Sequence, residues 1–354
     1  MKSEQPRIAV IGCGAVTKWR HLPALAKLGV TPVLLVDPDM DRARGLAEAF
    51  RVPGVAADYR PHLGEFDAAI IASPHHLHAP VSIDLLGRGV HVLLEKPMAM
   101  TAAECDQVMA AAEAGGSVLA VGLMRRYFWA ARWLKAALGA GALGPIESVD
   151  VREGFIYEWP VASSFFFRKE TAGGGVLFDL GAHTLDLLLW WLGDVAEFEY
   201  YDDSYGGVEA DCKLRLTMAS GARGTVELSR TRNLRNTAVL RGPRGEIEIG
   251  LDRNYLRADP AGLLSYKKDE VRANVLPEDV LKELNEMFVL QAEDWLRAIR
   301  EGVPPQVPGA EAKRSIGLIG ACYANRRRWE LPWVHTGGRG QAREAGLRLE
   351  AVKS

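Results

Sequence analysis

The first 122 residues alternate short, uniformly apolar segments with segments of helical periodicity. The apolar segments are rich in β-branched and aliphatic residues and span 7–12, 31–37, 66–73, 90–96 and 117–122. Strands that are apolar on both faces are typical of a parallel sheet covered by helices on both sides. The alternation therefore predicts an α/β fold with a doubly wound parallel sheet over residues 1–122.

The pattern changes after about residue 145. Residues 208–218 alternate apolar with polar side chains, and Ser220-Gly221 and the stretch 242–245 are typical hairpin turns. Further strands are predicted over 224–232 and 245–250, and helices near 280–301 and 309–328, with the run Asn325–Arg328 as a solvated helix end. We therefore predict an α+β domain with a largely antiparallel sheet over residues 123–334, and a flexible tail over 335–354.

Composition disfavours several classes of function. The chain of 354 residues carries a formal net charge of −2, which gives no indication of binding to nucleic acid or acidic membranes. No apolar run approaches the roughly 18 residues of a membrane span, and no signal peptide is predicted. The four cysteines are scattered, so neither a disulfide framework nor a metal site is predicted. These features favour a cytoplasmic protein without nucleic-acid or membrane partners.

A glycine turn joins the first predicted strand to the helix that follows it. Gly12 permits a tight turn, and Gly14 lets the backbone approach a pyrophosphate, which would rest on the helix that begins near Ala15 and Val16. The third position of the motif is Thr17, in place of the usual glycine or alanine. Taken alone, such a motif is equally typical of an ordinary tight turn.

Asp37 ends the second predicted strand, at a place where an acidic residue binds the adenosine ribose. A carboxylate there repels a 2′-phosphate, which favours NAD over NADP, although Arg42 and Arg44 nearby leave NADP open. An aspartate before Pro38 is also a common turn residue. The order of strand, glycines, helix, strand and acid nevertheless favours dinucleotide binding.

The segment 173–193 starts with three glycines and continues as an apolar helix that Asp179, His183 and Asp186 interrupt. Spacings of four and three place the three side chains on one helical face. Because charged groups are rarely buried without partners, these side chains are candidates for a functional site. A capping aspartate with a core histidine is the alternative. The glycines are predicted to let the backbone pass close to substrate or cofactor, or else to form a flexible loop.

The triplet Glu95-Lys96-Pro97 closes the predicted strand 90–96, at the sheet edge where parallel sheets bind ligands. Together with the glycine turn, Asp37 and the segment 173–183, it makes the sequence resemble the glucose–fructose oxidoreductase, inositol dehydrogenase and MocA family from residue 7 to about 332. Further matches are Ser73-Pro74, His78, Gly122 and Arg125-Arg126-Tyr127. The resemblance implies an N-terminal Rossmann domain, an open-faced second sheet, a nicotinamide cofactor and oxidation or reduction at a hydroxyl or ketone of a sugar or polyol.

The resemblance also implies roles for single residues. Lys96, Asp179 and His183 match the catalytic set: His183 is expected to be the general base, Lys96 to polarise the reacting oxygen, and Asp179 to orient His183 or bind a neighbouring hydroxyl. Asp186 is left either to support the site from behind these residues or to helix packing. Residues expected at the cofactor are Gly12, Gly14, Ala15, Val16, Asp37, Ser73, Pro74, His78, Glu95 and Lys96. His75 stands where the family often has asparagine, with His76 beside it.

An aromatic segment precedes the catalytic helix. Tyr157, Trp159 and Arg168, with Arg125, are candidates to line a sugar pocket, although such a cluster is as often core or interface. The resemblance further implies a homodimer or homotetramer. Two other functions stay open: an NAD-dependent, redox-neutral glycosidase, and a nicotinamide-binding sensor without turnover.

Overall fold

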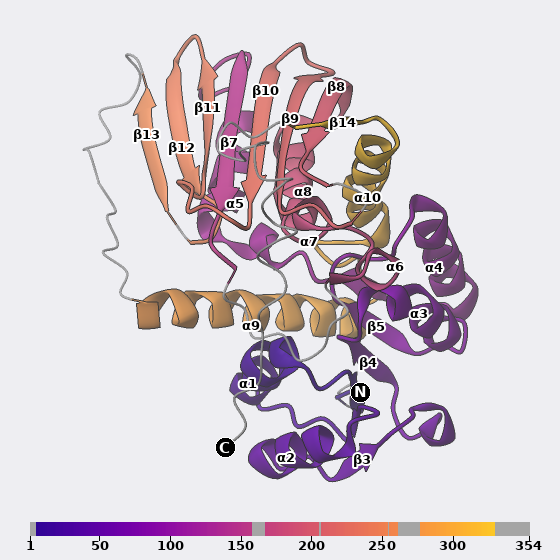
Figure 1. Ribbon diagram of the computed structural model, residues 1–354. Coiled ribbons are helices and arrows are strands. Elements are labelled where there is room, and N and C mark those ends of the chain that lie inside the picture. Colours follow the sequence, from indigo (N-terminus) through magenta and orange to yellow (C-terminus); the bar gives the residue numbers. More distant parts are fainter. Residues whose placement is uncertain (1–4, 158–166, 205–206, 254, 261–276, 330–354) are drawn as a thin grey trace, which may run out of the picture.

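The computed structural model describes residues 5–157, 167–204, 207–253, 255–260 and 277–329. It contains two sheets, one of six strands and one of eight (Figure 1). The predicted tail, residues 335–354, lies outside the described residues.

The six-stranded sheet has the order β3-β2-β1-β4-β5-β6, and its neighbouring strands are parallel. Its strands are β1 (Ile8–Ile11), β2 (Leu34–Val36), β3 (Gly54–Ala56), β4 (Ala68–Ile71), β5 (His91–Leu94) and β6 (Leu119–Val121). Helices α1 (Leu22–Lys27), α2 (Met40–Phe50), α3 (His78–Leu86) and α4 (Ala102–Gly115) connect them. The predicted doubly wound sheet is confirmed. The short strand β3 was missed because its half-exposed residues give little apolar signal.

The fully buried strands explain why their sequences are apolar at every position. Each residue of β1 and β4 is buried, because helices cover both faces of the sheet. The carboxyl ends of β1, β2, β4, β5 and β6 lie at one edge, since the strands run in the same direction. Gly12, Asp37, Ala72, Glu95 and Gly122 each follow directly after one of these ends. The sheet therefore brings residues far apart in the chain to one edge.

The eight-stranded sheet has the order β13-β12-β11-β7-β10-β9-β8-β14 and is largely antiparallel, with β7 parallel to β10 and β14 parallel to β8. Its strands are β7 (Ser148–Gly154), β8 (Val195–Asp202), β9 (Asp211–Met218), β10 (Arg223–Ser229), β11 (Thr237–Gly242), β12 (Gly245–Gly250), β13 (Leu256–Pro260) and β14 (Arg326–Arg328). In β9 the apolar side chains of the predicted alternation are buried and Arg215 is exposed. The predicted open-faced sheet is confirmed, with its apolar side against helices.

One prediction about this sheet is wrong. The run Asn325–Arg328 does not end a helix, because α10 (Gly309–Ala324) stops before it and Arg326–Arg328 form the edge strand β14. The strand pairs with Tyr200–Asp202 of β8, and the Arg326 and Arg327 side chains pair with Asp202 and Glu199. Acidic partners on β8 outweigh the preference of this cationic run for a helix end.

Two helices of the second half, α9 and α10, pack against the first sheet. Helix α9 (Pro277–Glu301) runs between the two sheets in Figure 1, and its fully buried Trp295 belongs to the apolar core around β1. Helix α10 begins beside β6, where Pro308 forms a bridge with Ala120. The two sheets are therefore joined by packed helices as well as by the chain itself.

Within the described ranges, no single helix is long and apolar enough to cross a membrane. The bent pair Lys169–Asp179 and Gly181–Leu192 meets that requirement jointly, by length and composition only.

Candidate active site

A cavity of about 420 Å³ lies at the carboxyl edge of the six-stranded sheet. Residues from both halves of the chain line it. From the first half come Gly12, Gly14, Ala15, Val16, Asp37, Ser73, Pro74, His75, His78, Glu95, Lys96 and Gly122, and from the second Arg125, Tyr157, Asp179, His183 and Arg230, among others. The structure thus brings to one cavity the expected cofactor residues and the three expected catalytic residues.

The glycine turn approaches the next strand closely. Gly12 has a φ of +99°, and a Cβ there would lie 2.4 Å from the carbonyl oxygen of Ala72. At Gly14 a Cβ would meet no atom within 4 Å. Gly12 is thus required by the fold, whereas Gly14 leaves room for a ligand to approach the backbone.

Thr17 occupies the third position of the glycine motif, where glycine or alanine is usual. Its buried hydroxyl donates to the carbonyl oxygen of Gly12 at 2.6 Å. The helix begins there with a π-helical turn over Thr17–His21. The larger side chain is accommodated by a hydrogen bond that ties the helix back to the turn.

Asp37 is buried, and its carboxylate accepts from the backbone N–H of Cys13 at 2.8 Å and of Asp39 at 2.9 Å. Arg42 lies 3.4 Å from the same carboxylate. A carboxylate has about four lone-pair sites, so Asp37 keeps acceptor capacity for ribose hydroxyls. Arg44 is exposed and pairs with Asp41, so it does not line the cavity.

Glu95 is hydrogen-bonded through both of its carboxylate oxygens. Its Oε1 lies 2.8 Å from Nε2 of buried His21, and its Oε2 accepts from the backbone N–H of Lys96. Burial alone would raise the pKa of Glu95, but His21 and Lys96 hold it below its usual value. Glu95 is therefore an ionised residue that fixes the end of β5 while it faces the cavity.

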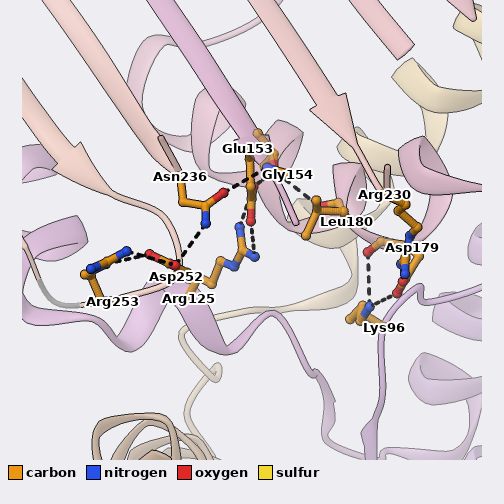
Figure 2. A network of polar contacts seen from close by, with 11 residues as sticks. Lys96, Arg125, Glu153, Gly154, Asp179, Leu180, Arg230, Asn236, Asp252 and Arg253 are labelled. Carbon is orange, nitrogen blue, oxygen red and sulfur yellow. Dashed lines mark hydrogen bonds and ion pairs between the residues drawn. The ribbon is translucent and has the colours of Figure 1, made fainter. Parts of the chain in front are cut away.

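Lys96 and Asp179 meet across the two halves of the molecule, as Figure 2 shows. The Lys96 ammonium donates to Asp179 Oδ1 at 2.5 Å and to the Asp179 carbonyl oxygen at 3.0 Å. The guanidinium of Arg230, one residue beyond β10, forms an ion pair with the other carboxylate oxygen. Burial lowers the pKa of Lys96 to about 8, with Arg230 and Arg125 contributing in the same direction against Glu95.

The predicted single helix over Asp179, His183 and Asp186 is broken into two helices. The three side chains therefore do not share one continuous helical face, as the sequence predicted. Helix α7 ends at Asp179 and α8 begins at Gly181, with 48° between the flanking segments. The N–H of His183 donates to Leu180, while the Asp179 carbonyl accepts from Lys96. Asp186 pairs with Arg126 in the interior, at 2.6 and 2.8 Å, and does not line the cavity.

His183 lies in the first turn of α8 and is buried, with 8% of its surface exposed. Its Nδ1 has no hydrogen-bond partner among the described residues. Burial, with the cations Lys96 and Arg125, lowers the pKa of His183 well below its usual value. The imidazole is therefore neutral at pH 7 and able to accept a proton.

The three glycines before α7 pack closely against other parts of the protein and do not line the cavity. A Cβ at Gly174 would lie 1.9 Å from the Tyr323 hydroxyl, and one at Gly175 would lie 1.8 Å from the carbonyl oxygen of Glu209. Glu209 accepts from the first N–H groups of α7, through its carbonyl and its side chain. The glycines let α7 dock against this residue, and the docking places Asp179.

Two histidines support the cavity wall. His78 is buried, with Nδ1 2.7 Å from the Pro97 carbonyl and Nε2 2.8 Å from the Ser73 carbonyl. It thus links the loops that follow β4 and β5. His75 contacts the carbonyl of Ala172 through Nδ1 at 2.8 Å, and burial lowers its pKa to about 3. His75 is therefore a neutral link between the two halves.

The expected substrate residues separate into three groups. Arg125 and Tyr157 line the cavity, but Arg125 is also bound by both carboxylate oxygens of Glu153, at 2.5 and 2.9 Å (Figure 2). Arg168 is exposed and does not line the cavity. Trp159 lies outside the described residues.

Sequence reasoning missed Arg230 and Glu153. Glu153 also accepts from the Thr184 hydroxyl at 2.5 Å, so it joins β7, α8 and Arg125. Both residues belong to strands or strand ends with no motif around them. The only signal available was an acid and a base among the apolar alternation of predicted strands, which is too common to select a site.

The residues present fit a dinucleotide with a nicotinamide. Gly14 leaves the backbone open, Asp37 keeps acceptor capacity, and the buried Ser73 hydroxyl has no partner among the described residues. Comparison with known families shows which cofactor the site binds. Residues 6–123 match the oxidoreductase family with an NAD-binding Rossmann fold, and residues 131–248 match the GFO/IDH/MocA C-terminal domain. The chain belongs to this family. It is an NAD-binding oxidoreductase.

Curated relatives extend the comparison. The chain is 38% identical over 197 residues to a putative UDP-kanosamine synthase oxidoreductase subunit of Amycolatopsis mediterranei, covering 54% of this chain and only 52% of that relative. It is 25% identical to inositol 2-dehydrogenase of Rubrobacter xylanophilus, covering 92% of both chains.

A solved structure with the same fold is the WlbA dehydrogenase of Bordetella pertussis in complex with NADH and UDP-GlcNAcA. The TM-score is 0.80 at 21% identity, over 92% of this chain and 96% of that one.

Proposed function

We propose that this oxidoreductase transfers a hydride between NAD and a secondary alcohol or ketone of a sugar, an inositol or a sugar derivative. The observation that carries the proposal is the convergence of Lys96, Asp179 and His183 on the cavity that holds the glycine turn and Asp37. NAD supplies the hydride acceptor or donor at its nicotinamide. The residues of this chain supply position and proton transfer.

His183 is the proposed acid and base. It is neutral at pH 7, so it can take the hydroxyl proton as the carbon is oxidised, and return it in the reverse direction. The two cations that lower its pKa also disfavour retention of the proton. His183 therefore accepts a proton and passes it on, without storing it.

Lys96 and Asp179 are proposed to act on the reacting oxygen and its neighbour. With a pKa of about 8, Lys96 is mainly an ammonium at pH 7 and can donate to the oxygen that gains negative charge. Asp179 holds that ammonium in place and offers acceptor atoms to an adjacent hydroxyl. A substrate with neighbouring hydroxyls, such as a sugar or an inositol, fits these donors and acceptors.

The family and the relatives' names support the substrate class. An inositol dehydrogenase and a subunit named for a nucleotide-sugar synthase act on polyhydroxylated rings by name, and we extend that class to this chain. The proposal includes a cytoplasmic homodimer or homotetramer, in which the polar face of the eight-stranded sheet pairs with that of a second copy.

The test follows reduced-nicotinamide absorbance with NAD and a panel of inositols, aldoses, sugar phosphates and nucleotide sugars. We expect one class to react, and His183→Ala to lower kcat by at least about 100-fold while the dissociation constant for NADH stays within a few-fold. His62→Ala, a histidine on a distant surface turn paired with Glu65, is the matched control and should react like the wild type.

Other outcomes of the same assay would count against the proposal. A histidine variant that turns over like the wild type removes His183 from the reaction. Tight NADH binding without any net reduction across the panel, but with release of a sugar from a glycoside, indicates the redox-neutral glycosidase. NADH binding with neither reaction indicates a sensor.

A further inference from the structure

Asp179 carries two cations on its two carboxylate oxygens. Lys96 Nζ lies 2.5 Å from Oδ1, and the Arg230 guanidinium pairs with Oδ2 (Figure 2). The two cations come from different halves of the molecule, Lys96 after β5 and Arg230 after β10. One carboxylate therefore cannot neutralise either cation fully, because it is shared between them.

Arg230 is held firmly in this position. Its guanidinium lies over the Tyr157 ring, 4.3 Å from the ring centre, and 6.0 Å from the centre of the Phe155 ring. Its backbone N–H donates to the Ala210 carbonyl at 2.8 Å, and 14% of its side chain is exposed. The guanidinium also hydrogen-bonds to Tyr157, and its further N–H groups are available to Asp179. Because arginine stays protonated in proteins, this positive charge is permanent.

On the basis of the proposed function, we propose that Arg230 is a positioning residue of the active site, which fixes the Asp179 carboxylate and sets the alkaline limit of the reaction through Lys96. Arg230 does this in two ways that act in the same direction. Its charge repels the Lys96 ammonium, and its hold on Oδ2 prevents Lys96 from taking the whole carboxylate.

Charged and titratable groups face Lys96 from several elements. They are Glu95 beside it, Asp179 on α7, His183 on α8, His75 and His78 after β4, Arg125 after β6, Glu153 on β7 and Arg230 after β10. Burial is the largest influence that lowers the Lys96 pKa, Glu95 and Glu153 oppose it, and Arg230 is the first of the two arginines that reinforce it. Removing the Arg230 charge must therefore raise the pKa of Lys96.

The sign for activity follows from the role of Lys96. In the proposed mechanism the ammonium form is active, so the rate falls as pH rises through the Lys96 pKa. Replacing Arg230 by an uncharged residue moves this fall to higher pH, by about one unit for the loss of one neighbouring charge. A purely structural role for Arg230 lowers the rate by the same factor at every pH and leaves the midpoint unchanged.

The experiment compares Arg230→Met with Arg230→Lys, which keeps a positive charge, and with Arg235→Met as the matched control. Arg235 lies on the same connection but is exposed and paired with Asp150. For each protein, kcat and kcat/KM are measured from pH 6 to 10 with the substrate that the panel of inositols, aldoses, sugar phosphates and nucleotide sugars identifies. Independently of turnover, the pH dependence of acetic anhydride labelling at Lys96 is followed by mass spectrometry of its peptide.

We expect a Lys96 labelling midpoint near 8 in the wild type, in Arg235→Met and, to within a few tenths of a unit, in Arg230→Lys. In Arg230→Met we expect it about one unit higher, together with the alkaline fall in kcat. An unshifted midpoint in Arg230→Met overturns the proposal.

A wild-type midpoint near 10.4, the ordinary value for lysine, also overturns it, even if the methionine variant does not fold. If no substrate reacts but the labelling midpoint shifts, the proposed reaction fails and the coupling of Arg230 to Lys96 stands.

Discussion

At the residue scale, Lys96 shows how burial and neighbours give a common side chain a specific chemistry. It lies directly after a buried strand, and 17% of its side chain is exposed. Its position brings it between a carboxylate and two arginines, and its pKa falls to about 8. A surface lysine with the same sequence neighbours would remain an ammonium across the whole physiological range.

Replacing Lys96 by methionine keeps the length of the side chain and removes its charge. Because the reacting oxygen then lacks its cationic donor, we expect kcat to fall by about 10²- to 10⁴-fold. The dissociation constant for NADH should change much less, since the glycine turn and Asp37 are unaffected. Steady-state kinetics and NADH fluorescence titration measure the two quantities. Lys27→Met, at an exposed helix end, is the control, and equal losses in both variants would refute the assignment.

At the element scale, the glycines before α7 are the least obvious part of the active site. They do not line the cavity. They allow close approach to Glu209 and Tyr323, whose contacts determine where α7 begins and so where Asp179 lies. The break at Leu180 then frees the Asp179 carbonyl for Lys96. A short helix with a defined start and a defined break is what positions the Asp179 carboxylate, the proposed acceptor for a substrate hydroxyl.

Gly175→Ala tests this interpretation. The added Cβ would lie 1.8 Å from a backbone carbonyl, so α7 must shift, and we expect a loss of about 1–3 kcal/mol in the free energy of unfolding together with reduced kcat. Gly317→Ala in α10 is the matched control, because its Cβ would meet no atom within 4 Å. That change should stabilise the protein by up to about 1 kcal/mol. Chemical denaturation measures the unfolding free energy of both variants, and steady-state kinetics measures their kcat. A Gly175→Ala protein as stable and active as the wild type would contradict the packing role.

At the scale of the whole molecule, three consecutive residues that follow β6, the last strand of the first sheet, bind three different elements of the second half. Arg125 binds Glu153 on β7, Arg126 binds Asp186 on α8, and Tyr127 donates to Asp294 on α9 at 2.9 Å. Arg126 also lies 3.2 Å from a carboxylate of α10, and its guanidinium is over the Trp190 ring. The short segment that leaves the first sheet is therefore fixed to the second half, because each of its three side chains contacts a different element.

Asp186→Asn breaks the buried pair and leaves Arg126 largely without its counter-charge. Both side chains are 2% exposed, so we expect a loss of about 3–5 kcal/mol in unfolding free energy. The double change Arg126→Met with Asp186→Leu should cost less than either single change, because no charge is then left buried. Arg297→Met, which removes a half-exposed pair with Asp294, should cost under about 1 kcal/mol. Urea unfolding measures all of these, and additive costs in the double variant would argue against a coupled pair.

Local patterns in the sequence determined most of the fold and part of the site. The uniformly apolar strands, the glycine turn, Asp37 and the alternation of 208–218 each reflect neighbours along the chain or burial of a whole face. Such signals are legible in one sequence because their periodicity is short. They were enough to predict the doubly wound sheet, the largely antiparallel second sheet and the NAD-binding edge.

Tertiary structure alone decided which charges meet. Asp179 and Asp186 look alike in the sequence, yet one faces the cavity between Lys96 and Arg230, and the other pairs with Arg126 in the interior. Arg326–Arg328 became an edge strand because acidic partners on β8 lie beside it. Ion pairs form between residues that are distant in the chain and have no periodicity, and only the packing of the two sheets and their helices brings those residues within a few ångströms of each other.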